Sequence, residues 1–480
     1  MGWKIVNQVI GQIGIGELGG KEVRRGCPEQ RKNCIKKGLC LIILVSGKIG
    51  CMFSKPKTEK RRLWPFILPG IAGLVLLALG LYQVPAVRSR VEWRLDAAEA
   101  FVRVALNPVG EVPTPLPMPV VHITHEATTA PAETSVPATT ATEQPTAMAL
   151  VESPAPMPSP TALPQKVQLT APAFEKQDWN ACGPATLAMH LRMYGWEGDQ
   201  FVISEEIKAN RRDRNVNVEE LAAYVINSMP ELNVQYRVGG DLEMLRRLLA
   251  AGFPVMIEEA FKLPEAFWFE DDLWSGHYLL LTGYDEAAQT FIAQDSYIGR
   301  NQIVSYVTLE ANWKTFNRVY LMVYPPDQED LLASVLGAEW DRDANRQHAL
   351  DAAQAAVEAD PEDSFEWFNL GTNLVYFEQY AEAAQAYDRV RELGMPQRML
   401  RYQFGPFHAY FHAGRTEDLL AMTAYSLKST PNSEETLLWQ GWGLYRMGDR
   451  EGALASFEEA LAVNPLYGDA EYAINYVLAN

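Results

Sequence analysis

The chain has 480 residues, about three domains' worth at roughly 150 residues each. Hydrophobic residues make up 48% of it and charged residues 21%, which excludes a globally disordered or collagen-like chain. The formal net charge is −18, but residues 1–62 hold 14 Lys and Arg against 4 Asp and Glu. The remaining 418 residues therefore carry a net charge of −28. An acidic body of this size repels the nucleic-acid backbone, so DNA and RNA are not expected partners.

The cysteines are distributed unevenly. Four of the five precede Met52, and only Cys182 follows it. A single cysteine in the last 429 residues cannot form an intramolecular disulfide or a site with several thiolate ligands. It can act as a nucleophile.

An uncharged apolar run covers residues 63–82. As a helix it would cross the hydrocarbon core of about 30 Å, so we expect a transmembrane helix over residues 63–84. Five Lys and Arg side chains between residues 55 and 62 precede the run. They predict a cytoplasmic N-terminus over residues 1–62 and a cell-membrane protein whose remaining chain is extracytoplasmic. The alternative is a cleaved signal peptide, whose apolar segment has only about 7–15 residues.

Residues 1–51 show no element that could fold alone. Met52 opens a short basic segment directly before the apolar run, which resembles a natural protein start. We therefore expect that residues 1–51 are not translated.

Residues 85–164 are predicted to link this anchor to the folded part of the chain. Apolar residues recur every three or four positions from Val91 through Leu95, Ala98 and Val102 to Leu106, which predicts an amphipathic juxtamembrane helix. The composition then changes, with 12 Pro and 11 Thr between residues 111 and 170. Such a stretch predicts an extended stalk.

Residues 338–480 contain an internal repeat. Four prolines, Pro361, Pro396, Pro431 and Pro465, are spaced 35, 35 and 34 residues apart. This region resembles tetratricopeptide repeats, whose period is 34 residues, although the unit around Gly405 departs from the pattern. The resemblance implies all-α helix pairs that bind a protein partner or substrate, and a purely structural helical cap is an equal alternative.

Residues 165–326 contain the candidate active site, which begins around Cys182. Pro184 suits the first turn of a helix, and Leu187, Leu191 and Tyr194 give that helix a buried face. Cys182 is therefore expected at a helix N-terminus, where unpaired N–H groups and the helix dipole stabilise a thiolate.

A glutamine and a histidine complete the predicted site around Cys182. Gln177 lies five residues upstream of Cys182 and can donate its amide to an oxyanion. The segment has just two histidines, and His190 lies eight residues along the same helix, about 12 Å away. By elimination, His277 is the expected general base.

A β-hairpin is expected to orient His277. Residues 277–284 and 290–294 are predicted to be strands, joined by a turn centred on Glu286. That register pairs Leu281 with Phe291, Leu279 with Ala293 and His277 with Asp295, and a one-residue slip would break it. Asp295 is therefore the expected orienting carboxylate.

These motifs resemble the C39-like cysteine peptidases, which have a papain-like α+β fold. The matching segments are Q-x-W-N-x-C-G-P-A-T-L-A-M, G-H-Y-x-x-L-x-G-Y-D and Q-D-S-Y, between Gln177 and about Tyr324. By that likeness Cys182 is the nucleophile, His277 the base, Asp295 the orienting group and Gln177 the oxyanion donor. No transporter domain follows, so cleavage after a double glycine, known from family members fused to transporters, is not expected.

The surroundings of the site carry aromatic and acidic residues. Four aromatic residues are expected in the core or the cleft wall: Trp196, Phe267, Trp268 and Trp274. Five acidic residues are expected on a solvated lip that favours basic substrates: Glu258, Glu259, Glu270, Asp271 and Asp272. No metal or nucleotide motif occurs, so we expect no cofactor and no metal ligand.

The sequence therefore predicts a membrane-anchored thiol peptidase that hydrolyses peptide or isopeptide bonds through an acyl-enzyme. Two alternatives stay open, a catalytically inactive interaction scaffold and an acyltransferase of the transglutaminase type. The expected partners are a peptide or protein substrate, a protein on the helical repeats, and the membrane.

Overall fold

The computed structural model describes residues 64–117, 162–208 and 216–480. The predicted basic segment, the proposed start at Met52 and most of the predicted stalk, residues 118–161, lie outside the described residues.

The predicted apolar helix is α2 (Trp64–Tyr82). Among the described residues, however, no helix has both the length and the apolar character needed to cross a membrane.

The predicted juxtamembrane helix is α3 (Pro85–Leu106), but its buried face differs from the prediction. The expected apolar stripe is exposed, since Leu95 is 59% and Leu106 82% accessible. Ala100 and Val104 are buried instead. The prediction of the face was wrong because α3 packs through small side chains four residues apart, which a count of large apolar residues overlooks.

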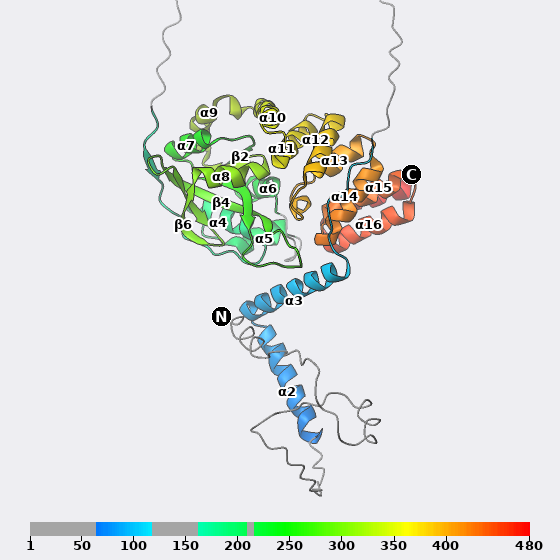
Figure 1. Cartoon of the computed structure of the whole chain (residues 1–480). Helices are drawn as coiled ribbons and strands as arrows, with labels where there is room; N and C mark the ends of the chain where they lie inside the picture. Colours follow the sequence, from blue (N-terminus) through cyan, green and yellow to red (C-terminus); the bar gives the residue numbers. More distant parts are fainter. Residues whose placement is uncertain (1–63, 118–161, 209–215) are drawn as a thin grey trace, which may run out of the picture. The chain divides into compact units, whose positions relative to one another are not determined.

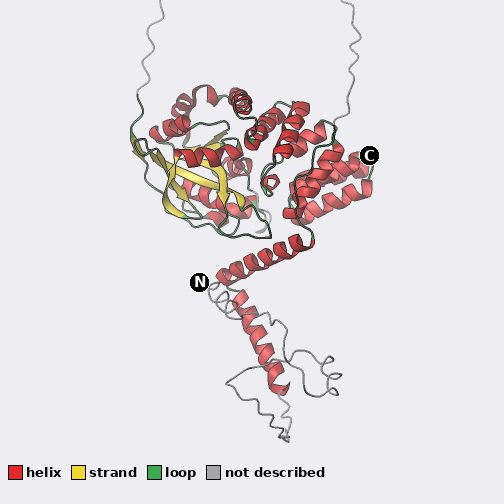
Figure 2. Cartoon of the chain, viewed as in Figure 1, coloured by secondary structure: helices red, strands yellow, loops and turns green. Residues whose placement is uncertain are grey.

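The α+β part follows, and its strands join in one seven-stranded antiparallel sheet within the described residues (Figures 1 and 2). The strand order is β2-β7-β3-β4-β5-β6, and β1 pairs with β4. The strands are β1 (Lys166–Gln168), β2 (Asn233–Arg237), β3 (Val255–Lys262), β4 (Trp274–Asp285), β5 (Thr290–Asp295), β6 (Gly299–Ser305) and β7 (Tyr320–Tyr324). The helices are α4 (Cys182–Arg192), α5 (Gln200–Ile207), α6 (Val218–Ser228), α7 (Leu242–Ala250), α8 (Tyr306–Trp313) and α9 (Glu329–Leu336).

Both faces of this sheet are buried. In β4, Leu279 and Leu281 join one hydrophobic cluster, together with residues of α7, α8 and α9. Tyr278 and Leu280 join a second cluster with residues of α4 and α6. Because both faces of the sheet are covered, the sequence of β4 is a continuous apolar run and does not alternate between apolar and polar residues.

The C-terminal part is made of paired helices, as the repeat pattern predicts. Each of the four spaced prolines comes two or three residues after a helix ends, at Ala359, Leu393, Ser429 and Val463. The departing unit around Gly405 has a first helix of only eight residues. The helices are α10 (Arg342–Ala359), α11 (Ser364–Tyr376), α12 (Tyr380–Leu393), α13 (Gly405–His412), α14 (Thr416–Ser429), α15 (Glu434–Arg446), α16 (Arg450–Val463) and α17 (Gly468–Ala479).

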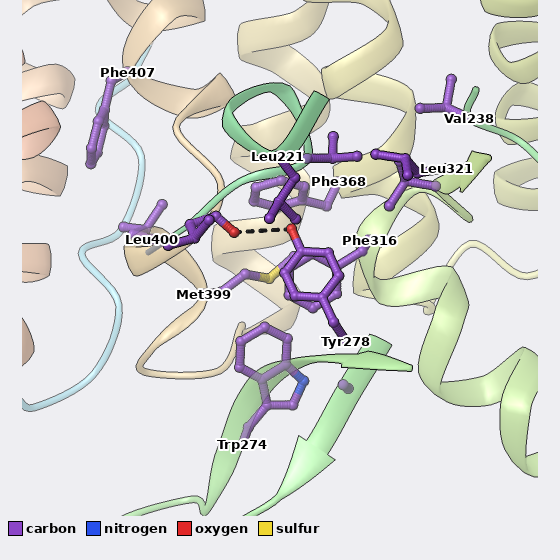
Figure 3. Packing of buried hydrophobic residues seen from close by; sticks show 14 of the residues in the cluster. Leu221, Val238, Trp274, Tyr278, Phe316, Leu321, Phe368, Met399, Leu400 and Phe407 are labelled. Atoms are coloured by element: carbon purple, nitrogen blue, oxygen red, sulfur yellow. Dashed lines mark hydrogen bonds between the residues drawn. The ribbon is translucent and has the colours of Figure 1, made fainter. Parts of the chain in front are cut away.

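One buried cluster contains residues from both the sheet domain and the helical repeats. Figure 3 shows Tyr278 and Phe316 of the sheet domain in the same cluster as Phe368 and Met399 of the repeats. The rings of Trp274 and Phe316 stack with centroids 5.6 Å apart. The repeats therefore share a core with the domain that carries the candidate site.

Candidate active site

Cys182 is the first residue of α4, as predicted. No side chain caps this helix, because the residue before it is Ala181. Among the described cysteines Cys182 is a free thiol, and its side chain lies in the lining of a cavity. The first turn of α4 therefore leaves its N–H groups and its dipole available to a thiolate.

His277 and Asp295 are hydrogen-bonded to each other. His277 Nε2 lies 2.9 Å from Asp295 Oδ1, and both side chains are buried. The same carboxylate oxygen accepts the backbone N–H groups of Tyr297 at 2.7 Å and Ile298 at 2.9 Å. Burial raises the pKa of Asp295, but the His277 and backbone hydrogen bonds outweigh it and lower the pKa below its usual value. Asp295 is thus a carboxylate that fixes the imidazole ring.

The second ring nitrogen of His277, Nδ1, remains for the thiol of Cys182. Burial raises the pKa of the Cys182 thiol, but the hydrogen bond and charge of His277 outweigh it and lower the pKa. Burial lowers the pKa of His277, but its hydrogen bonds to Asp295 and Cys182 raise it well above the usual histidine value. Opposite shifts of this kind describe a thiolate–imidazolium pair.

The predicted hairpin exists, but its register was wrong by two residues at the site. Asp295 pairs with Leu279 rather than His277, and Ala293 pairs with Leu281. Between the turn and a bulge at Leu281 and Gly283, the observed pairing differs from the predicted one by one further residue. A shift of two keeps every side chain on the same face, so His277 still reaches Asp295 diagonally.

Gln177 lies beside Cys182 and His277 in the cavity lining. Its backbone N–H donates to the Ser296 carbonyl, and its Oε1 accepts the Ser296 hydroxyl at 2.9 Å. Ser296 therefore binds the oxygen of the Gln177 side-chain amide. Within the described residues, the amide nitrogen Nε2 makes no hydrogen bond. The structure thus brings all four predicted site residues together.

His190 is separated from the site, as predicted. It is completely buried in α4, and its Nε2 accepts the backbone N–H of Val323 at 3.4 Å. Burial lowers its pKa to about 3, so the ring is neutral at physiological pH.

The cavity beside Cys182 has a volume of about 370 Å³, and aromatic side chains form part of its wall. Phe261 lies 5.2 Å from the His277 ring, centroid to centroid, and 5.1 Å from the Tyr297 ring. Trp93 of α3 packs against Phe267 at 6.2 Å, and Tyr402 from the repeats also lines the cavity. Phe267 is therefore cleft wall, whereas Trp268 and Trp274 are core.

The predicted acidic lip was wrong for Glu258, Glu259 and Asp271, whereas Glu270 and Asp272 are exposed as predicted. Glu258 and Glu259 are buried on β3, where Glu259 is the cross-strand neighbour of His277. Asp271 pairs with Arg398 of the repeats, with one contact of 2.6 Å. Burial raises the pKa of Glu259 to about 7, although the charge of His277 lowers it. The carboxylates of Glu258, Glu259 and Asp271 are buried within the protein, so they are not available to bind basic substrates.

Several residues of the site carry no local sequence signal. Trp93 and Tyr402 reach the cavity from elements far away in the sequence, and only the folded chain reveals them. Ser296 could have been found, because it directly follows Asp295. Within the described ranges, no group of three or more His, Cys, Asp or Glu side chains is placed to hold a metal ion.

Residues 163–321 match the model of the Peptidase_C39 like family. This part of the chain is a C39-like peptidase domain. The search of curated proteins found no match.

Solved structures resemble separate parts of the chain. A C39-like peptidase from Bacillus anthracis is 20% identical, over 33% of this chain and 96% of that chain, with a TM-score of 0.27. A double glycine motif protease from an AMS/PCAT transporter, solved with its leader peptide, is 17% identical over 33% of this chain and 94% of that chain, with a TM-score of 0.25. MamA is 14% identical over 28% of this chain and 79% of that chain, with a TM-score of 0.26.

Proposed function

We propose that the C39-like domain hydrolyses peptide or isopeptide bonds, with Cys182 as the nucleophile. The observation that supports this most is the hydrogen-bonded series from Asp295 through His277 to Cys182, with opposite pKa shifts on the histidine and the thiol. A buried cysteine with a structural role needs no such partners.

In the first half of the reaction, the Cys182 thiolate attacks the substrate carbonyl carbon and forms a C–S bond. The backbone N–H of the helix terminus and the Gln177 amide donate to the oxyanion. The C–N bond then breaks, and His277 gives its proton to the leaving amine. An acyl-enzyme on Cys182 and a neutral His277 remain.

In the second half, water attacks the thioester carbonyl while His277 accepts one of its protons. The C–S bond breaks, the acid leaves, and the thiolate and the imidazolium are restored. Asp295 keeps the ring oriented and stabilises its charged form throughout. His277 thus acts first as an acid and then as a base.

The walls of the cavity support a preference for bulky apolar or aromatic side chains near the cleaved bond. Phe261, Phe267 and Trp93 offer aromatic surface there. Burying such a side chain against aromatic walls contributes on the order of 2 kcal/mol.

The test is to incubate the full-length chain with a diverse peptide library and to compare it with Cys182→Ala. We expect cleavage by the parent chain, enriched beside aromatic or large aliphatic residues, and none by Cys182→Ala. Peptide binding without cleavage in either form would support the scaffold alternative. Incorporation of an added amine in place of water would support acyl transfer.

We further propose that the domain is extracytoplasmic and tethered to the cell membrane. This rests on the apolar run at residues 63–82 and the Lys and Arg residues before it. An amine reagent that cannot cross membranes should label Lys262 on whole cells and spare Lys55 and Lys57. Equal protection of all three lysines would contradict this location.

A further inference from the structure

The residues that follow α3 lie along the helical repeats. Residues 109–116 form no helix or strand, and they contact α12 and α14 (Figure 1). Val109 is 3% accessible, and Val112 packs against the buried cluster that includes the repeats. This part of the predicted stalk is therefore bound to the protein.

The repeats contact this segment mainly through its main chain. Arg391 of α12 donates to the Pro113 carbonyl from Nε at 2.7 Å and to the Thr114 carbonyl from Nη2 at 2.9 Å. Asp418 of α14 accepts the N–H of Leu116 at 3.1 Å. These three contacts thus bind two successive carbonyls and, two residues further on, one N–H group of the segment. Lys428 adds a fourth contact, donating to the Val109 carbonyl at 3.4 Å.

The receiving side chains form a buried charged group. The side chain of Arg391 is 1% accessible and that of Asp418 4%, and Arg391 Nη1 donates to Asp418 Oδ1 at 2.7 Å. Arg415 pairs with the other Asp418 oxygen at 2.7 Å and with Asp388. Without the segment, two of the three nitrogens of the buried Arg391 guanidinium would lose their partners, which costs free energy.

Proline suits the segment to this site. Pro113 and Pro115 have no N–H to leave unpaired, and they hold the backbone extended before binding. The groups that the repeats bind are three carbonyls and the N–H of Leu116, which is not a proline.

We propose that Arg391, Asp418 and Lys428, the α12–α14 clamp, form a binding site for extended, proline-containing peptides, and that residues 109–116 are its internal ligand. The site recognises main-chain groups through the buried Arg391–Asp418 pair, with Val109 and Val112 as apolar anchors. A second peptide of this kind binds only after it displaces the internal segment. This proposal does not depend on catalysis at Cys182.

The internal contact is tested by hydrogen exchange on the full-length chain. The amide of Leu116, whose N–H Asp418 accepts, should be protected, and Arg391→Gln should raise its exchange rate at least tenfold. Arg389→Gln is the matched control, because Arg389 lies on the same helix with a side chain that is 32% accessible. Equal exchange in the parent chain and in Arg391→Gln would overturn the proposal.

The peptide specificity is tested with a variant that leaves the clamp intact. The double substitution Val109→Asp and Val112→Asp should release the internal segment. A fluorescent peptide with the sequence of residues 109–117 should then bind at least tenfold more tightly than to the parent chain, whose own segment competes at a high effective concentration. Adding Arg391→Gln should abolish this gain. Equal affinity of the peptide for the parent and released chains would overturn the proposal.

Discussion

His190 and His277 belong to one domain, yet their surroundings move their pKa values in opposite directions. His277 lies between a carboxylate and a thiol, which raise its pKa despite burial. His190 is buried without a charged partner, and burial alone lowers its pKa to about 3. Elimination by helical distance was enough to predict from the sequence that His190 lies apart from Cys182. The buried state of Glu259, by contrast, depends on the sheet and could not be predicted from a run of acidic residues.

The pKa of His190 predicts a loss of stability in acid. The unfolded chain binds a proton on this ring below pH 6.5, whereas the folded chain does not until about pH 3. Between these values, each unit by which the pH falls should reduce the free energy of unfolding by about 1.4 kcal/mol because of His190. His190→Gln should flatten that part of the pH profile, measured by urea unfolding.

A matched control is His348→Gln, since the His348 side chain is 60% accessible. If His190→Gln left the acid slope unchanged, His190 would not be buried in its neutral form.

At the scale of elements, the hairpin shows what a sequence pattern can and cannot supply. The strands and the meeting of His277 with Asp295 were predicted, because a two-residue shift leaves the faces unchanged. The register itself was missed, since the bulge between Leu281 and Gly283 has no reliable local signal. The face of α3 was also mispredicted, because tertiary partners rather than its own periodicity decide which side is buried.

The repeats were predicted more fully, because each helix pair is held by local contacts. Gly371 in α11 lies against the Tyr387 ring of α12, where an added Cβ would come within 2.7 Å of the ring. Gly371→Ala should therefore destabilise the protein by about 1–3 kcal/mol, measured by thermal or urea unfolding.

Gly468→Ala is the control, since it lies in α17 with open space around it. It should be neutral or slightly stabilising because alanine favours helix. Similar effects of the two substitutions would show that the α11–α12 packing is not as described.

At the scale of the whole described part, contacts distant in sequence join the peptidase domain to the repeats. The shared cluster, Trp93 in the cavity and the pairing of Asp271 with Arg398 all link residues of different segments. None of them could be predicted, because the sequence indicates each domain separately and contains no signal for how the surfaces meet.

The buried pair predicts that the two parts depend on each other for stability. The side chains of Arg398 and Asp271 are 1% and 0% accessible. Arg398→Met would leave a buried carboxylate without its cation and should cost about 3–5 kcal/mol of unfolding free energy. Arg389→Met, on a partly exposed arginine, should cost less than about 1 kcal/mol. An unchanged urea midpoint for Arg398→Met would contradict the shared core.

The central claim is that Cys182 is a thiolate paired with His277, and its alkylation rate tests this most directly. Iodoacetamide labelling of the Cys182 peptide in the full-length chain should be followed by mass spectrometry between pH 5 and 9, with N-acetylcysteine as reference. The reference should slow by roughly a hundredfold between pH 8.5 and pH 6, as for an ordinary thiol of pKa near 8.5.

Cys182 should lose much less of its rate over the same range, because His277 lowers its pKa. His277→Ala should make it follow the reference. A parent chain whose Cys182 already slows in parallel with N-acetylcysteine would contradict the ion pair and the catalytic role built on it.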